Sequence, residues 1–121
     1  MNKILSFPPY LRLRKPAEYK KVFANPVKSS DSYFTLLAIS NLTDSPRLGL
    51  AIAKKNIKRA VDRNRLKRTV RESFRMQQHK LSNIDIVVLA RKSAVDVSPD
   101  VLRKSLEKHW LRLVNRCESC S

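Results

Sequence analysis

The sequence has no apolar run long enough to cross a membrane. Its longest apolar run, residues 84–90, contains Asp85, whereas a membrane-spanning helix needs about 20 apolar residues. The N-terminus has only Lys3 ahead of a short apolar stretch that Pro8 and Pro9 interrupt, which does not favour a signal peptide. We therefore expect a cytoplasmic protein without a membrane partner.

Cysteine is almost absent as well. The two cysteines, Cys117 and Cys120, lie near the C-terminus, and such a pair supplies only two of the four ligands that a structural zinc ion needs. His109 could be a third ligand, but no fourth is evident. We expect reduced thiols in a frayed tail and no cofactor bound by the protein itself.

Acidic residues number only 10, and their distribution excludes the usual hydrolytic sites. Hydrolysis of a phosphodiester by a protein requires clustered carboxylates that hold metal ions, or an acid–base pair built on histidine. No two carboxylates form a D-x-D or D-x-E pattern, and the two histidines, His79 and His109, are far apart in the sequence. The chain therefore shows no catalytic centre of its own.

Positive charge is what the sequence has in excess. The 121 residues include 26 Lys plus Arg against 10 Asp plus Glu, which gives a formal net charge of +16 and a pI of about 10.6. A charge of this sign and size favours association with polyanions, although it says nothing about the fold. The length suits one domain with a modest core.

The excess charge is concentrated in residues 56–75, which contain neither Pro nor Gly and predict a helix. Leu66, Val70 and Phe74 recur every four residues and would form one apolar stripe. Successive helical residues lie about 100° apart, so a different face would carry a row of cations: Arg68, Arg71 and Arg75, with Arg65 and Lys58 close beside them.

Only Asp62 and Glu72 interrupt this positive charge, so internal ion pairs cannot neutralise it. The like charges repel one another at i, i+3 and i+4 spacing, and a polyanion would relieve that repulsion. A solvated charged face is the alternative. Arginine outnumbers lysine within 63–75, and because its guanidinium makes bidentate contacts with phosphate, we favour binding to RNA or DNA.

The rest of the chain predicts an α+β domain with the order α-β-β-β-α-β-α. Residues 16–25 predict a short helix that ends before Pro26, and the apolar residues 84–90 predict a buried central strand. We expect a single RNA-binding domain over residues 1–121, ordered from about 11 to 115, with a flexible N-terminal arm and C-terminal tail. The other expected elements are strands at 27–30, 33–40 and 47–53, the last two as an antiparallel hairpin, and a final helix from the Ser98 cap to about Asn115 with the apolar stripe Leu102, Leu106, Trp110, Leu113 and Val114.

The string Arg63-Asn64-Arg65-Leu66-Lys67-Arg68, with residues 53–56 before it and 71–75 after it, resembles the RNR motif of the bacterial ribonuclease P protein subunit. The resemblance extends from about Leu11 to Trp110. It implies a two-layer sandwich with a four-stranded mixed sheet, in which a left-handed crossover through the basic helix joins the parallel third and fourth strands. General chirality favours a right-handed connection, and here we follow the family.

The resemblance also implies a function. In bacterial ribonuclease P, the RNA subunit and its bound Mg²⁺ ions remove the 5′ leader from precursor tRNA, while the protein binds the RNA subunit and holds the leader. This chain would then be the accessory protein subunit of an endoribonuclease, and catalysis would reside in the RNA. Its expected partners are the ribonuclease P RNA subunit and the precursor tRNA 5′ leader, with no obligate protein partner.

The functional positions of the family carry over to residues of this sequence. The RNR-motif contacts to the RNA subunit would be Arg63, Asn64, Arg65, Lys67, Arg68 and Arg71. Further phosphate contacts would come from Lys54, Lys55, Arg91 and Lys92. A cleft between the first helix and the sheet, which receives the leader in the family, would be lined by Tyr19, Phe23, Tyr33 and Leu37. The i, i+4 spacing of the first two aromatics is by itself more typical of core packing, so for them the resemblance reverses the interpretation.

Two other functions share part of this pattern. A ribosomal protein or an RNA chaperone would have similar charge and size, but would not account for the string at 63–68. A DNA-binding protein would place the basic helix in a major groove, and a helix-turn-helix requires a second helix a short turn away. Here strands are expected on both sides of the basic helix.

Overall fold

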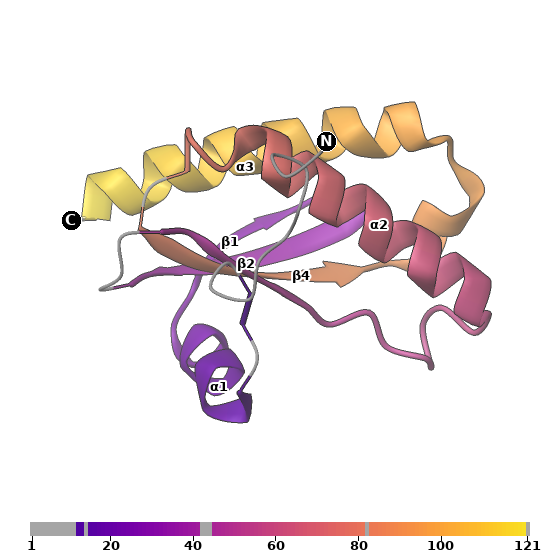
Figure 1. Ribbon diagram of the computed structural model, residues 1–121, viewed down its shortest axis with the longest axis horizontal. Coiled ribbons are helices and arrows are strands. Elements are labelled where there is room, and N and C mark those ends of the chain that lie inside the picture. Colours follow the sequence, from indigo (N-terminus) through magenta and orange to yellow (C-terminus); the bar gives the residue numbers. More distant parts are fainter. Residues whose placement is uncertain (1–11, 14, 42–44, 82, 121) are drawn as a thin grey trace, which may run out of the picture.

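The computed structural model describes residues 12–13, 15–41, 45–81 and 83–120, with side chains described as far as Arg116. The elements follow the expected order, with one added 3-10 helix (Figure 1). They are α1 (Pro16–Ala24), β1 (Val27–Ser30), β2 (Phe34–Ser40), β3 (Arg47–Leu50), α2 (Ala60–Gln77), β4 (Ile84–Ala90), the 3-10 helix η3 (Lys92–Asp96) and α3 (Pro99–Cys120).

Strand β4 lies inside a four-stranded mixed sheet of order β1-β2-β4-β3. It pairs antiparallel with β2 and parallel with β3 and is buried along nearly its whole length, which confirms the expected central strand. The prediction that residues 33–40 and 47–53 pair as an antiparallel hairpin is wrong, because β4 separates β2 from β3. An apolar strand is fully covered only when it is paired on both edges and packed on both faces.

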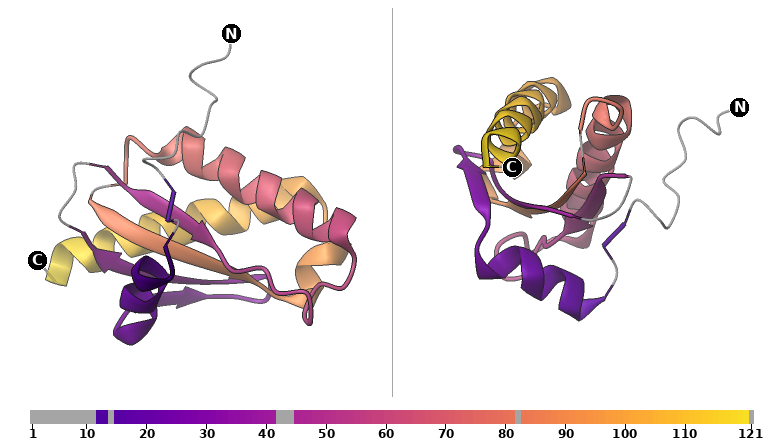
Figure 2. Two further views of the ribbon diagram at one scale, coloured as in Figure 1. Left: turned by 60° about the horizontal axis from the view of Figure 1, so that its bottom comes forward. Right: turned by 90° about the vertical axis from the view of Figure 1, so that its left-hand side faces the viewer.

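Helices cover both faces of the sheet. α2 and α3 lie side by side on one face and form the expected two-layer sandwich with it, whereas α1 lies on the opposite face (Figures 1 and 2). In the right-hand view of Figure 2, α2 and α3 are on top, β3 and β4 run away from the viewer, and β4 lies to the left of β3. The crossover through α2 is therefore left-handed, as the resemblance implied, and the α+β class is confirmed.

The apolar stripe of α2 is buried as predicted. Leu66, Val70 and Phe74 are each 0% exposed and pack against the sheet in one large core. The ring centroids of Phe74 and Trp110 on α3 are 6.0 Å apart at an interplanar angle of 71°, the edge-to-face arrangement that aromatic pairs prefer. The Trp110 Nε1–H donates to Ser73 Oγ at 2.8 Å, so the buried indole has its hydrogen-bond partner.

A smaller core holds α1 against the other face of the sheet. Val22 of α1 packs with Leu13, Leu37 and Val87, and none of the four is more than 9% exposed. The Leu13 N–H donates to Leu48 O of β3 at 2.9 Å. The last residues of the expected N-terminal arm thus lie along β3, and residues 1–11 and 14 lie outside the described part of the chain.

Arg47 ties α1, β3 and β4 together. Its guanidinium donates two hydrogen bonds to the buried Asp85 carboxylate, from Nε at 2.8 Å and from Nη2 at 2.7 Å, and one to Glu18 Oε2 at 2.9 Å. Asn41 Nδ2 donates to the same Asp85 carboxylate at 2.7 Å. An aspartate is therefore tolerated inside the apolar strand, because its charge is paired and hydrogen-bonded.

The helix α2 begins later than expected, at Ala60 rather than near residue 56. Residues 53–57 form a turn in which the Ile57 N–H donates to a backbone carbonyl at 3.0 Å, and the buried Ile57 side chain anchors this turn. Lys58 therefore precedes the helix and does not share a helical face with Arg68. β4 follows α2 directly, so α2 is not part of a helix-turn-helix.

The helix α3 continues to Cys120 instead of fading near Asn115, so the two cysteines lie on a helix rather than in a frayed tail. Its first turn is capped as predicted, with the Val101 N–H 3.4 Å from Ser98 Oγ. The predicted stripe is also confirmed, since four of its residues are buried and Val114 is partly buried. None of the helices described has the length and apolarity that a membrane span requires.

A buried polar cluster joins α3 to β1. His109 is 1% exposed, with Nδ1 2.6 Å from Ser29 Oγ and Nε2 3.1 Å from Asp31 Oδ2. Arg112 Nη1 donates to the same Ser29 Oγ at 3.1 Å. Burial lowers the pKa of His109 below 6.5, although Asp31 acts in the opposite sense.

The burial of His109 predicts a loss of stability in weak acid. Because its pKa is lowered, the imidazole binds a proton less readily in the folded protein than in the unfolded chain, where it binds one as the pH falls through about 6.5. The free energy of unfolding should therefore decrease between about pH 7 and pH 5. Urea denaturation at the two pH values should show a smaller decrease for His109→Gln than for the wild type.

The exposed histidine, His79, provides the matched control. His79→Gln removes the same kind of side chain from the surface and should keep the wild-type decrease between the two pH values. If His109→Gln loses as much stability as the wild type over this interval, His109 is not the group that binds the proton.

Candidate nucleic-acid interface

The outward side of α2 carries a continuous basic row, because its apolar stripe faces the sheet. Asn64, Arg68, Arg71 and Arg75 follow one another at intervals of four, three and four residues and line an open hollow along the helix, together with Glu72. The face predicted from the arginine spacing is thus a single surface. It presents several N–H donors and only one carboxylate.

Two arginines of this row are available to a ligand. Arg68 and Arg71 are exposed, and their side chains make no ion pair or hydrogen bond within the described part of the chain. The Nε of Arg75 is buried and has no hydrogen-bond partner among the described residues. Lys67 is half-buried on another side of the helix. A guanidinium without an internal partner can bind a phosphate without first breaking an ion pair.

Arg63 and Arg65 are held by the backbone of neighbouring segments. Arg63 Nη1 donates to Ile57 O and Lys58 O, at 2.8 Å each, and so closes the turn ahead of α2. Arg65 Nη2 donates to Val95 O in η3 at 2.8 Å. The predicted RNR-motif residues therefore divide into anchored and free arginines, although each anchored guanidinium keeps further N–H donors.

The flanking cations gather at one end of the sheet. β3 and β4 are parallel, so the segments that follow them leave the sheet at the same end, where α2 begins (Figure 1). Lys54 and Lys55 are exposed in the turn after β3, and Arg91 and Lys92 are exposed directly after β4. The structure thus brings to one end of the sheet two pairs of cations that are more than 30 positions apart in the sequence.

The two predicted aromatics of α1 have different environments. The Tyr19 ring lies over Gly49 of β3, where a Cβ would be only 2.7 Å from Tyr19 Cε1 and 2.8 Å from Cζ. Only glycine leaves room for this ring. Phe23 is 46% exposed, and Val22 is the α1 residue that fills the core. Phe23 is therefore not a core residue, although the i, i+4 spacing alone would have suggested core packing.

The other two predicted cleft residues do not join Phe23 at the surface. Leu37 is 9% exposed and belongs to the small core beneath α1. Tyr33 precedes β2 and packs against the large core on the α2 and α3 side. The structure therefore does not bring all four predicted cleft residues together.

Polar residues that the sequence analysis missed lie on the α1 face of the sheet. Lys28 pairs with Leu37, and Ser30 pairs with Thr35, so the three polar side chains share the face of Leu37. Arg91 reaches across them, with Nη2 3.2 Å from Thr35 Oγ1 and 3.4 Å from Ser30 Oγ. The two-residue period of β1 and β2 was the signal that would have identified them.

Several of the acidic residues are engaged in structural contacts. Asp85 binds Arg47, Asp31 accepts a hydrogen bond from Ser105, and Asp100 pairs with Arg103. Across the described residues, no group of three or more His, Cys, Asp or Glu could hold a metal ion. The chemistry that this arrangement offers is the binding of anions by arginine and lysine.

Comparisons with known proteins give the relationships of the chain. The family model for ribonuclease P matches residues 7–114. The chain is 52% identical over 115 residues to the ribonuclease P protein component of Methylococcus capsulatus, which covers 95% of this chain and 90% of that protein. The RNase P protein of Staphylococcus aureus is similar with a TM-score of 0.77 and 31% identity, over 84% of this chain and 93% of that one. The RNase P protein of Thermotoga maritima is similar with a TM-score of 0.76 and 32% identity, over 84% of this chain and 96% of that one.

The division into anchored and free arginines predicts different effects on stability. Arg63→Ala removes two hydrogen bonds from a charged donor and should lower the free energy of unfolding by roughly 1.5–3 kcal/mol. Arg68→Ala removes no internal partner and should change it by less than about 0.5 kcal/mol. Urea denaturation of the protein without a ligand measures both values. An equal loss in the two variants would mean that Arg68 is structural.

Proposed function

The chain belongs to the ribonuclease P protein family and is thus a component of an endoribonuclease that processes tRNA. We propose that it binds the RNA subunit through α2, and that it binds the 5′ leader of precursor tRNA through the α1 face of the sheet. The observation that carries this proposal is the row of arginines on α2 that have no internal partner. In this proposal the protein binds and positions RNA, and the RNA subunit catalyses the cleavage.

The basic row of α2 suits the backbone of a folded RNA. Arg68 and Arg71 lie on an exposed helix face with Asn64 between the helix start and the two guanidinium groups. Bidentate pairing of guanidinium with phosphate is stronger than a single hydrogen bond and fixes orientation. Bound phosphates would also relieve the repulsion between arginines at i, i+3 and i+4 spacing. Lys54 and Lys55 would extend the contact beyond the start of α2.

The α1 face of the sheet suits a single strand of RNA. Phe23 is exposed enough to stack on a base, and Lys28 and Arg91 place positive charge on the same face. Stacking beside cations binds single strands with little sequence preference, because every base has a π face. A leader that differs from one precursor tRNA to the next requires this kind of recognition. Tyr19 would support the site from its position over Gly49.

The proposal assigns the chemical step to the RNA subunit and its Mg²⁺ ions. Two described carboxylates near the basic surfaces are paired with other side chains, Asp62 with Arg65 and Asp31 with Ser105. His109 is enclosed in the core. The residues of this chain would act by raising the affinity of the complex for precursor tRNA.

Reconstitution tests this function directly. Protein that is rigorously free of RNA should not cleave precursor tRNA, and addition of the RNA subunit with Mg²⁺ should give a cut that leaves the mature 5′ end. Arg68→Ala should weaken the binding of the RNA subunit and reduce the slope of log K against log salt concentration by about 0.9, because one phosphate contact is lost. Specific cleavage by the RNA-free protein would refute the proposal.

The leader site makes a separate prediction. Phe23→Ala should weaken the binding of precursor tRNA to the reconstituted enzyme by on the order of 1–3 kcal/mol, the value of one base stacked on an aromatic ring. Binding of mature tRNA and assembly with the RNA subunit should not change, since neither involves a leader. The measurement is the ratio of the precursor and mature tRNA affinities in each protein.

Leu111→Ala is the matched control, because Leu111 is an exposed apolar residue on α3, 65% exposed. It should leave the ratio of affinities as in the wild type. A melting curve accompanies each variant, since loss of a buried Phe would cost roughly 3–5 kcal/mol of stability. An unchanged ratio in Phe23→Ala would remove this aromatic from the leader site.

A further inference from the structure

A second basic surface runs along α3, outside the regions that the proposed function uses. It consists of Lys104, Lys108, Arg112 and Arg116, which are exposed and recur every four residues; we call it the α3 strip. None of its members forms an ion pair within the described part of the chain. A helix places residues at this spacing on one side, so the four cations form a line.

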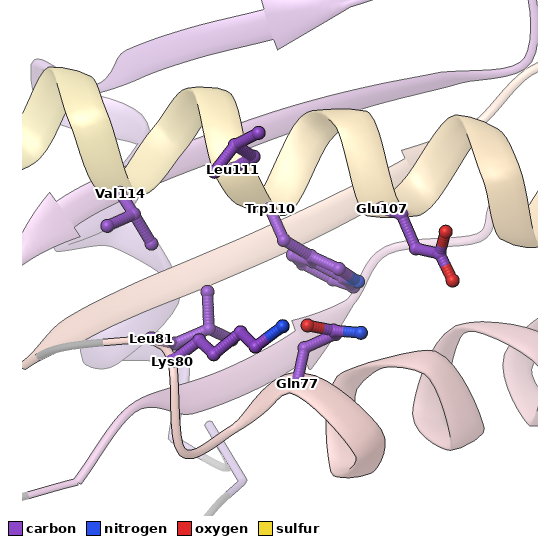
Figure 3. Close-up of a pocket in the computed structure, with 7 residues that line it drawn as sticks. All are labelled: Gln77, Lys80, Leu81, Glu107, Trp110, Leu111 and Val114. Atoms are coloured by element: carbon purple, nitrogen blue, oxygen red, sulfur yellow. The ribbon is translucent and has the colours of Figure 1, made fainter.

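The described acidic side chains of α3 make no ion pair with the strip. Asp100 is paired with Arg103. Glu107 faces α2 and borders a hollow of about 240 Å³ together with Gln77, Lys80 and Trp110 (Figure 3). Within the described part of α3, therefore, no carboxylate is paired with a cation of the strip.

Two members of the strip are fixed at the free edge of the sheet. Arg112 Nη1 donates to Ser29 Oγ at 3.1 Å, and Arg116 Nη1 donates to the backbone carbonyl of Lys28. Among the described strands, β1 pairs with β2 alone and lies at the end of the sheet, so no described strand covers its other edge. Each guanidinium has five N–H donors, and the contact with β1 uses one nitrogen of each. The remaining donors are held close to the edge.

The strip continues the α1 face of the sheet around this edge. Ser29 points towards α3, and its neighbours Lys28 and Ser30 point to the face that carries α1. The right-hand view of Figure 2 shows α3 above β1, with α2 farther from this edge. Positive charge thus passes from Arg91 and Lys28 over β1 to α3, on the side of the molecule away from the basic row of α2.

We propose that the α3 strip, with Lys28, binds the phosphate backbone of the distal part of the 5′ leader, the part farthest from the cleavage site, after the leader leaves the α1 face across the edge of β1. This inference rests on the proposed function, because it extends the same single strand. It predicts that long leaders bind more tightly than leaders confined to the α1 face.

A single strand is the occupant that the shape of this path favours. The path turns from one face of the sheet to the other around one strand, and duplex nucleic acid, with a persistence length of about 150 base pairs, resists so sharp a bend. The side chains of the strip are all Lys or Arg. Contact is therefore with phosphates and is independent of the base sequence.

The test uses the enzyme reconstituted with its RNA subunit and a set of precursor tRNAs whose leaders grow by one nucleotide at a time. The variant is Lys104→Ala/Lys108→Ala, since neither lysine has a hydrogen-bond partner in the described part of the chain. The control is Lys80→Ala/Arg103→Ala, which removes the same charge from residues outside the strip. Dissociation constants are measured over a series of salt concentrations.

The wild type should gain affinity with leader length in two stages, and the strip variant should lose only the second. For the longest leaders, its slope of log K against log salt concentration should be smaller by about 1.4, or 0.7 for each lost contact with a single strand. Short-leader precursors, mature tRNA and assembly with the RNA subunit should be unaffected. The control should match the wild type at every length.

Three results would overturn the inference, and they are distinguishable. Equal weakening for mature tRNA and all precursors would assign the strip to the RNA subunit or the tRNA body. Wild-type affinities at every leader length would show that the strip is only a solvated surface. A wild-type enzyme that gains no affinity from any leader would refute the proposed leader site itself, and this result does not depend on the variant.

Discussion

Both sides of the molecule depend on the burial of strand β4. Its residues alternate between the two cores, with Ile86 and Val88 beneath α2 and α3 and Val87 beneath α1. A strand that is covered on both faces must also have its backbone groups paired on both edges, and β2 and β3 supply this pairing. Because β3 is parallel to β4, the chain has to cross over the sheet between them. That crossover contains α2, and it places the arginines of α2 on the surface.

The packing of α2 also explains how so much like charge is tolerated. Leu66, Val70 and Phe74 are completely buried, and full burial of such a side chain contributes about 1.5–3 kcal/mol. A like-charge pair on a helix surface costs only about 0.2–0.5 kcal/mol. Burial of the stripe therefore decides how the helix is oriented, and the outward side is left with a charge that a polyanion can relieve. Folding and RNA binding favour the same orientation.

Local sequence patterns were sufficient to predict every property that depends on neighbouring residues in the chain. The helical period separated Leu66 and Val70 from Arg68 and Arg71, and the apolar run at 84–90 predicted the central strand. Strand pairing was different. Residues 33–40 and 47–53 resemble hairpin partners because only a short turn-rich segment separates them, but β4 lies between β2 and β3. Pairing is decided by how the whole sheet covers its most apolar strand, and no single segment contains that information.

The same limit applies to the proposed binding surfaces. The sequence alone identified the arginines of the 63–71 segment, but the tertiary structure decided that Arg63 and Arg65 bind backbone carbonyls while Arg68 and Arg71 remain free. It also left Phe23 exposed and brought the side chains of α3 to the edge of β1. The sequence thus determined which residue types are present and which side of each helix they occupy. Their availability was decided by acceptors and neighbours from distant segments, which meet only when the chain folds.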